Sequence, residues 1–432
     1  MTNKDIRRKR YATKRKTGCI TCRVRRVKCD EAKPSCHRCT STGRKCDGYI
    51  FTPSQVGKIQ SLSFPTGGSD PENQAIYQFR TRISSLIASS FDIKFWTHDV
   101  LHNADAYTPV RHALAALASA YQKSILLGIK SASCDCFIFS QYEKAMRSLY
   151  TCFQGKALSA PQRLAALVAN FLFTYTCSLQ GLWQEALLHL RNGIALIHEW
   201  SDLRDNGQTT MIDILALYIR LDTQTRVIST NESVSILCED PSLQLSFTKI
   251  EQKLSVCPAM RQLDIIHSQL LQTSFPLSPT SKLFYEQSLM VWDLRYQDLS
   301  ATSNEQEKHI TALRMRRIMV EVSFMLATNV KDSAMNNCID VHCKAILDLA
   351  LQLIRSLSLR PAQAGFYLAN GLVEALYFVA VTSEDWDLRQ QAIDTLRQYR
   401  FTDGVWESEA AADLAARRLQ SDMNEYRRWL ET

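Results

Sequence analysis

The sequence contains little glycine and proline, with 14 and 11 of these residues among 432. Hydrophobic residues make up 46% of the chain and charged residues 22%. This is the composition of folded globular material, which excludes a collagen-like, a wholly disordered or a coiled-coil chain. A chain of this length suggests two or three domains and can bury a sizeable core without disulfides.

Long apolar runs are also missing. The nearest candidate, 366–381, is interrupted by Asn370 and Glu374, so no stretch reaches the roughly 18 uninterrupted apolar residues that a membrane-spanning helix needs. No apolar segment follows the charges of the first 16 residues, which argues against a secretory signal peptide and an interfacial membrane helix. We therefore expect a soluble intracellular protein with reduced thiols and no membrane partner.

Motifs of catalysis are missing as well. His198-Glu199 lacks the second histidine of a zinc-protease helix, and the chain has no Walker-type glycine-rich loop and no Gly-x-Ser-x-Gly elbow. Of the 14 cysteines, the eight outside residues 19–46 show no paired ligand spacing. We therefore expect that the chain is not an enzyme.

Charge is divided unevenly along the chain. Residues 1–50 hold 16 Lys and Arg against four acidic residues, a net charge of +12, whereas the other 382 residues hold 35 against 39, a net charge of −4. Concentrated positive charge favours a polyanion partner, most often nucleic acid. Two basic runs in this segment are predicted to be a nuclear localisation signal, extra phosphate contacts or both. They comprise Arg7, Arg8, Lys9, Arg10, Lys14, Arg15 and Lys16.

Six cysteines fall within 28 residues and repeat the spacing C-x2-C-x6-C twice, offset by 17 residues. Disulfides, one zinc ion with two spare thiols and a two-metal cluster are the three interpretations. The expected compartment disfavours disulfides, and a single ion leaves two thiols idle. Two tetrahedral zinc ions need eight ligand positions, which six thiolates fill only if two sulfurs bridge.

We therefore predict two Zn²⁺ ions per chain, bridged by the first cysteine of each repeat, Cys19 and Cys36. His37 is expected to be a surface or phosphate-facing residue. The two ligand sets are Cys19, Cys22, Cys29 and Cys36 for one ion, and Cys36, Cys39, Cys46 and Cys19 for the other.

The segments 18–30, 33–39 and 43–46 resemble the DNA-binding domain of fungal zinc-cluster (Zn2Cys6) transcription factors, with every ligand spacing in the commonest family form. The resemblance covers about a tenth of the chain, roughly residues 14–49. It implies two bridged zinc ions, a tight turn at Pro34 and a first-repeat helix that enters the major groove and reads a CGG-like triplet.

Four cations lie between the second and third cysteines, and the second repeat has no such run. We therefore expect a short cationic helix in the first repeat only. By the resemblance, Arg26 reads bases with Arg25 beside it, because a guanidinium can donate two hydrogen bonds to guanine. Arg23 and Lys28 are predicted to contact phosphates. A solvated charge is the alternative for each of the four.

Beyond residue 75, apolar residues recur every three or four positions, which predicts a nearly all-helical body. Residues 51–74 are rich in Ser, Gly, Pro and Thr, which predicts a flexible linker. The linker has no heptad run that would form a coiled coil, so the sequence leaves open whether the chain forms a homodimer. Segments such as 92–96, 110–117 and 404–408 are similar to the helical regulatory region of the same family. The predicted body helices include 183–200, 211–227, 260–275, 283–299, 305–329, 341–357 and 361–382.

The predicted fold class is a small zinc-cluster DNA-binding domain plus a large all-α regulatory domain. The expected function is a nuclear, sequence-specific regulator of RNA polymerase II transcription that binds double-stranded DNA and contacts the transcription machinery or co-regulators. The alternative is a helical scaffold or enzyme-like regulator tethered to nucleic acid by the cluster. RNA is disfavoured because Tyr11 and Tyr49 are the only aromatic residues among the first 50. The predicted domains are a basic arm (1–17), the cluster (18–48), a linker (49–74) and the helical domain (75–432).

Overall fold

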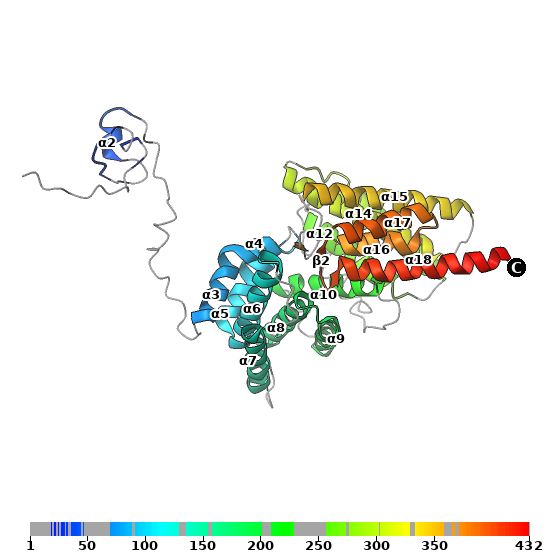
Figure 1. Cartoon of the computed structure of the whole chain (residues 1–432), viewed down its shortest axis with the longest axis horizontal. Helices are drawn as coiled ribbons and strands as arrows, with labels where there is room; N and C mark the ends of the chain where they lie inside the picture. Colours follow the sequence, from blue (N-terminus) through cyan, green and yellow to red (C-terminus); the bar gives the residue numbers. More distant parts are fainter. Residues whose placement is uncertain are drawn as a thin grey trace, which may run out of the picture. The chain divides into compact units, whose positions relative to one another are not determined.

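A computed structural model of the chain divides into two compact units, residues 1–67 and 68–432 (Figure 1). The structure describes residues 19, 21–22, 25, 27–30, 32, 36–44, 46, 70–88, 91–128, 135–153, 158–200, 209–228, 256–273, 276–301, 303–328, 333–357, 365–367 and 371–431.

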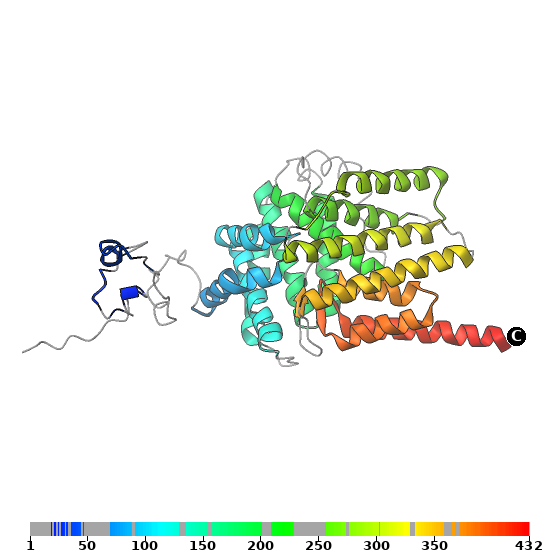
Figure 2. The same ribbon diagram turned by 90° about the horizontal axis from the view of Figure 1, so that it is seen from above.

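The second unit is built almost wholly of helices, which confirms the predicted fold class (Figure 2). Within the described residues, no helix has the length and hydropathy needed to cross a membrane. The α-helices are α3 (Asp70–Gln78), α4 (Ser84–Ile87), α5 (Val100–Ala106), α6 (Thr108–Tyr121), α7 (Cys136–Phe153), α8 (Ala160–Leu179), α9 (Trp183–Glu199), α10 (Thr209–Ile228), α12 (Val256–Leu270), α13 (Pro279–Tyr296), α14 (Asn304–Ala327), α15 (Ser333–Ser356), α16 (Leu372–Thr382), α17 (Trp386–Gln398) and α18 (Ser408–Glu431). The described residues also form the π-helical turns η2 (Phe79–Ile83), η3 (Phe95–Asp99) and η4 (Gln122–Leu126).

Several helices begin at side-chain caps that satisfy their first free N–H groups. The Ser278 hydroxyl accepts a hydrogen bond from the Ser281 N–H at 3.1 Å at the start of α13. The Asp385 carboxylate accepts from Asp387 and Leu388 at the start of α17. Such caps are worth about 1 kcal/mol each.

The structure corrects two predicted boundaries. Helix α3 begins at Asp70, inside the segment predicted as a linker up to residue 74. The predicted helix 361–382 is wrong in its first part, because strand β1 (Gly365–Tyr367) precedes α16. Strand β1 pairs in parallel with β2 (Phe401–Asp403), which pairs in antiparallel with β3 (Trp406–Glu407). Strands this short leave no periodic signal, and distant pairing rather than local sequence forms them.

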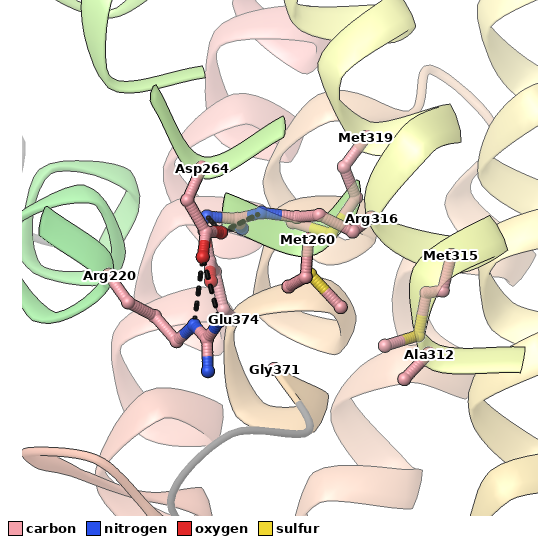
Figure 3. Close-up of a pocket in the computed structure, with 9 residues that line it drawn as sticks. All are labelled: Arg220, Met260, Asp264, Ala312, Met315, Arg316, Met319, Gly371 and Glu374. Carbon is pink, nitrogen blue, oxygen red and sulfur yellow. Dashed lines mark hydrogen bonds and ion pairs between the residues drawn. The ribbon is translucent and has the colours of Figure 1, made fainter. Parts of the chain in front are cut away.

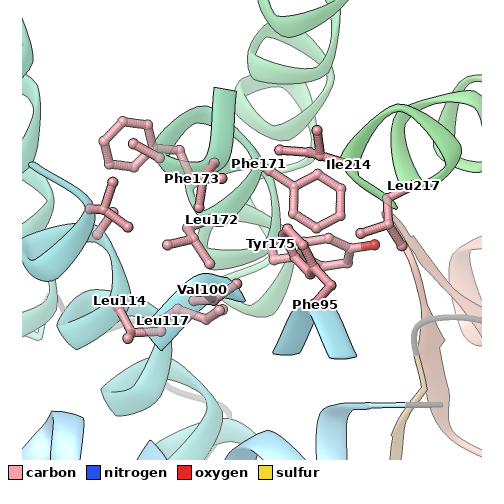
Figure 4. Packing of buried hydrophobic residues seen from close by; sticks show 14 of the residues in the cluster. Phe95, Val100, Leu114, Leu117, Phe171, Leu172, Phe173, Tyr175, Ile214 and Leu217 are labelled. Atoms are coloured by element: carbon pink, nitrogen blue, oxygen red, sulfur yellow. The ribbon is translucent and has the colours of Figure 1, made fainter. Parts of the chain in front are cut away.

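One hydrophobic core lies among the helices from α3 to α10 and includes Phe171 of α8 (Figure 4). The Phe171 ring lies edge-on to Phe95, with centroids 5.5 Å apart, and it also contacts Tyr175 and Tyr218 at 4.8 and 5.4 Å. Such edge-to-face pairs add to the stabilisation that burial of the rings provides.

A second core lies among α12 to α18, in which α14, α15, α17 and α18 lie side by side (Figures 1 and 2). Helix α10 belongs to both cores, since Tyr218 packs in the first and Ile228 in the second. The two cores therefore form parts of one compact unit.

The turn between β2 and β3 docks on α8 and α10 through Gly404. Its φ of +63° is unfavourable for other residues, and an added Cβ would lie 2.2 Å from Oε1 of Gln224. The Ser178 hydroxyl donates to the Gly404 carbonyl at 3.1 Å. A residue without a side chain is therefore required where the sheet meets the helices.

Two buried arginines join four helices around two buried carboxylates. Arg220 of α10 donates to Oδ2 of Asp264 of α12 from Nε and Nη2, at 2.9 and 2.8 Å. Arg316 of α14 donates to Oδ1 of Asp264 at 3.0 Å and to Glu374 of α16. All four residues are buried. Buried charges persist only when paired in this way.

The carboxyl group of Asp403 gives the helical unit a specific pH dependence. Burial and the nearby Glu374 raise its pKa to about 7, against the lowering effect of backbone donors such as the Val373 N–H. In the unfolded chain this group ionises near pH 3.8. Its contribution to stability is therefore lost as the pH rises from about 4 to about 7.

We predict that Asp403→Asn, which keeps the hydrogen-bond acceptor and removes the ionisation, gains about 2–4 kcal/mol of unfolding free energy relative to wild type between about pH 4.5 and 8. Urea unfolding monitored by helical circular dichroism measures this difference. The exposed Asp413→Asn is the matched control and should follow wild type. A constant difference between Asp403→Asn and wild type across this range would contradict the assignment.

Candidate metal centre and nucleic-acid interface

Four of the six predicted zinc ligands come together in the first unit. The Sγ atoms of Cys19, Cys22, Cys36 and Cys39 lie within 4.8 Å of one another, and all four side chains are buried. Sulfurs of the first repeat lie 3.6 to 3.8 Å from sulfurs of the second. The two repeats are therefore joined through their sulfur atoms.

These distances fit a zinc ion. Tetrahedral coordination with Zn–S bonds of about 2.3 Å places neighbouring sulfurs about 3.8 Å apart. Burial raises the pKa of the Cys19, Cys36 and Cys39 thiols, so a cation must stabilise their thiolates. Zinc does this, since a thiol that coordinates the ion is deprotonated. The residues present therefore suit the predicted metal.

The remaining two cysteines pack against this group. The Cys19 N–H donates to Sγ of Cys29 at 3.5 Å, and Cys29 also lies within 4.8 Å of Cys36, measured between ligand atoms. Cys46 is half-buried against the same cluster. The close group of four combines the first two cysteines of each repeat and so matches neither predicted ligand set. Which sulfurs bridge stays a prediction.

Asp30 ties the two repeats together and was not singled out by the sequence pattern. Its carboxylate accepts hydrogen bonds from the backbone N–H groups of His37 and Arg38, at 2.9 and 3.1 Å. Although desolvation opposes it, these donors lower the pKa of Asp30. They are the first N–H groups of helix α2 (His37–Thr40). Because this cap comes from seven residues upstream, no local capping pattern reveals it.

Helix α2 adds a short helix in the second repeat to the cationic helix predicted for the first repeat. It starts directly after Cys36 and carries His37 and Arg38 on exposed positions. The exposed side chain of His37 agrees with a surface role. The Asp30 carboxylate stabilises this short helix by accepting hydrogen bonds from its first two N–H groups.

The first repeat closes the helical turn that the sequence predicts. The Arg25 N–H donates to the Thr21 carbonyl at 3.1 Å. The Arg25 side chain is half-buried and donates from Nη1 to the Thr42 hydroxyl at 3.5 Å, while Lys28 is exposed. Arg25 thus contacts the second repeat. Arg23, Arg26, Pro34 and the two basic runs lie outside the described residues.

Residues 17–52 match the fungal Zn(2)-Cys(6) binuclear cluster domain. The chain therefore contains a fungal zinc-cluster domain. This confirms the resemblance drawn from the cysteine spacing, and zinc as the cofactor. No solved structure matches the chain.

Relatives among characterised proteins are named as regulators. The chain is 27% identical over 247 residues to the aspercryptin biosynthesis cluster-specific transcription regulator atnN of Emericella nidulans, covering 48% of this chain and 39% of the relative. It is 54% identical over 50 residues to the transcriptional regulatory protein moc3 of Schizosaccharomyces pombe, covering 12% and 10%. It is 32% identical over 161 residues to the Zn(2)-C6 fungal-type transcription factor afumD of Aspergillus fumigatus, covering 33% and 41%. The chain thus spans less than half the length of each of these relatives.

The bridging assignment predicts how zinc content responds to single substitutions. Wild-type protein in reducing buffer should hold two zinc ions, and Cys36→Ser should hold fewer than one, because a bridging sulfur serves both ions. Zinc released by acid and measured by atomic emission gives the stoichiometry. Cys152→Ser, at an exposed cysteine of the helical unit, should keep both ions. One ion retained at full occupancy in Cys36→Ser would exclude the bridge.

Proposed function

We propose that the chain is a sequence-specific DNA-binding regulator of RNA polymerase II transcription that reads CGG-like triplets. The observation that carries this proposal is the zinc-cluster match over residues 17–52, whose sulfurs lie at zinc-ligand distances. The net charge of +12 on residues 1–50 supports a polyanion partner. The names of its relatives support the regulatory role.

Zinc has a structural role in this proposal. The first unit has little apolar material, and its buried cluster consists of cysteines packed with Val27. A segment of this size needs a metal to hold its shape, and metal binding then supplies its folding free energy. The ions fix the two repeats so that the turn after Cys22 can enter the major groove.

The surroundings of the cations indicate which of them contact DNA bases and which contact phosphates. Lys28 is exposed, which suits a contact to the DNA backbone. Arg25 uses one donor on Thr42 and keeps the others for a base, so it would both join the repeats and contact DNA. Arg26 is assigned base reading and Arg23 a phosphate contact by resemblance.

Cellular context is part of the same proposal. A sequence-specific regulator of this kind acts in the nucleus, and the basic runs at 7–10 and 14–16 are the proposed import signal. Transcription co-regulators are the proposed partners of the helical unit, which would control the cluster. The competing proposal is a helical scaffold or enzyme-like regulator tethered to nucleic acid. It would predict nucleic-acid binding without preference for a CGG sequence.

We predict that Arg26→Ala costs about 1–3 kcal/mol of binding free energy on a CGG duplex and relaxes discrimination against duplexes that lack the guanines. The bidentate contact to guanine is the physical reason. Gel-shift titrations of the full chain at one salt concentration, on CGG duplex, scrambled duplex and single-stranded RNA, measure both effects. Equal weakening on CGG and scrambled duplexes would remove Arg26 from base reading.

Lys28→Ala is the matched control for this experiment. Loss of a phosphate contact should weaken binding to both duplexes alike and lower the slope of log K against log salt by about 1. Wild-type protein that binds CGG, scrambled duplex and RNA equally would favour the tethered scaffold over the sequence-specific regulator.

A further inference from the structure

Helix α13 carries apolar side chains on two opposite faces, and one of these faces is exposed. On the inward face, Trp292 donates from Nε1 to the Ala259 carbonyl of α12 at 2.9 Å. The Tyr285 ring lies 6.4 Å from the Phe324 ring of α14, measured between centroids. Figure 2 shows α13 at the edge of the helical unit. The large apolar side chains of its outward face are between 43% and 61% exposed and comprise Leu283, Phe284, Met290, Val291 and Leu294.

The outward residues follow the spacing with which helices pair. Positions 287, 290 and 294 lie four, seven and eleven residues after Leu283, which places all four along one line of the helix surface. The buried residues at 285, 289, 292 and 296 repeat this spacing and begin two residues later, about 200° around the helix. The outward row therefore has the pattern of the row with which α13 packs on its own bundle.

An apolar face of this kind is ordinarily covered. A helix that is apolar on opposite sides belongs in contact with other elements on both, and a contiguous exposed apolar patch marks an interaction site. Phe284 and Val291 extend the outward row along one edge, whereas Glu286 and Asp293 follow its other edge. A partner of α13 must therefore match an apolar row that has one apolar edge and one acidic edge.

Charge on the acidic edge is only partly offset by neighbouring cations. The Lys282 ammonium lies 3.9 Å from the Glu286 carboxylate, in an exposed pair that is weak in water. The Arg317 guanidinium is shared between Asp293 and Glu321. Three carboxylates therefore accompany two cations along this edge, which favours Lys or Arg on the partner.

A second copy of α13 does not supply this positive charge. In an antiparallel two-fold pair, like edges meet, so Glu286 of one copy would approach Asp293 of the other. In a parallel pair, the acidic edge would meet Phe284 and Val291 of the other copy, without a cation. Charge therefore favours a different helix over a second copy of this chain.

We propose that the outward face of α13 binds an amphipathic helix of a co-regulator protein that presents an aliphatic row flanked by Lys or Arg. The aliphatic row packs against Leu283, Met290 and Leu294, and the cations pair with the acidic edge. This assigns a surface and a partner chemistry to the co-regulator contact proposed above and rests on that part of the proposed function. It does not depend on how the zinc cluster reads DNA.

Methionine-methyl NMR of the full, zinc-loaded chain without DNA tests the proposal with two synthetic helical peptides of three heptads. The first has Leu at a and d and Lys at e and g, and the second has Glu in place of Lys. Lys on both edges keeps the peptides from pairing with one another, and lysine stems can lie along Phe284 and Val291.

We expect the Lys peptide to shift the ¹³C-methyl signal of Met290 saturably, and the Glu peptide to bind there at least about tenfold more weakly, because like charges would meet. Met146, exposed on α7, is the internal reference and should not shift. Because only Met290 reports on α13, binding of the Glu peptide to the basic first unit does not enter the comparison.

Substitutions at exposed positions sharpen the test. Leu294→Glu should weaken the Lys peptide at least about tenfold while retaining the helical circular dichroism, because an apolar contact at the centre of an interface is lost. Leu188→Glu, at an equally exposed position of α9, is the matched control and should bind as wild type does. Glu286→Lys should reverse the preference between the two peptides.

Three outcomes would overturn the proposal. The first is the absence of a saturable Met290 shift with the Lys peptide, and the second is equal binding of the two peptides at Met290. The third is a wild-type chain that sediments as a dimer in analytical ultracentrifugation and that Leu294→Glu converts to a monomer, because a second copy would then occupy this face. None of these outcomes alters the gel-shift result on CGG duplex, so failure here and failure of DNA reading are separate.

Discussion

The pairing of two buried guanidinium groups with two buried carboxylates is the constraint on which the helical unit depends. Asp264 accepts from both arginines and Glu374 from Arg316, so α10, α12, α14 and α16 meet at fixed positions. A shift of any of these helices would leave a charge buried and unpaired, which costs several kcal/mol. Apolar packing is non-directional, so the ion pairs restrict the helices around this site to one arrangement.

The ion pairs also affect two neighbouring titratable groups, His267 and Asp403. His267 lies 4.0 Å from Glu374, and burial together with Arg316 lowers its pKa, so it stays neutral and shares a hydrogen bond with the Ser323 hydroxyl. Burial and the nearby charge of Glu374 raise the pKa of Asp403. The charges at this junction, including those of Arg220 and Glu374 (Figure 3), thus influence one another.

The first unit is stabilised by different interactions from those of the helical unit. It has four buried cysteines where the helical unit has two extensive apolar cores. Metal–sulfur bonds and the Asp30 cap replace the hydrophobic effect as the source of its shape. We therefore expect the first unit to respond to chelators and oxidants, and the second to pH and denaturant. The positive charge of the chain is concentrated in the unit that holds the metal.

Local sequence determined much of this protein. The repeated cysteine spacing identified the metal and the zinc-cluster domain, and apolar residues every three or four positions located α9, α10 and α14 to within a few residues. Both signals lie within short stretches of chain. Only the tertiary structure decided which four sulfurs meet, that Asp30 caps α2, that β1 precedes α16, and that Arg220 finds Asp264 and Arg316 finds Glu374. These contacts join residues that lie far apart in sequence or on separate elements, and their geometry exists only once the helices and the two repeats have packed.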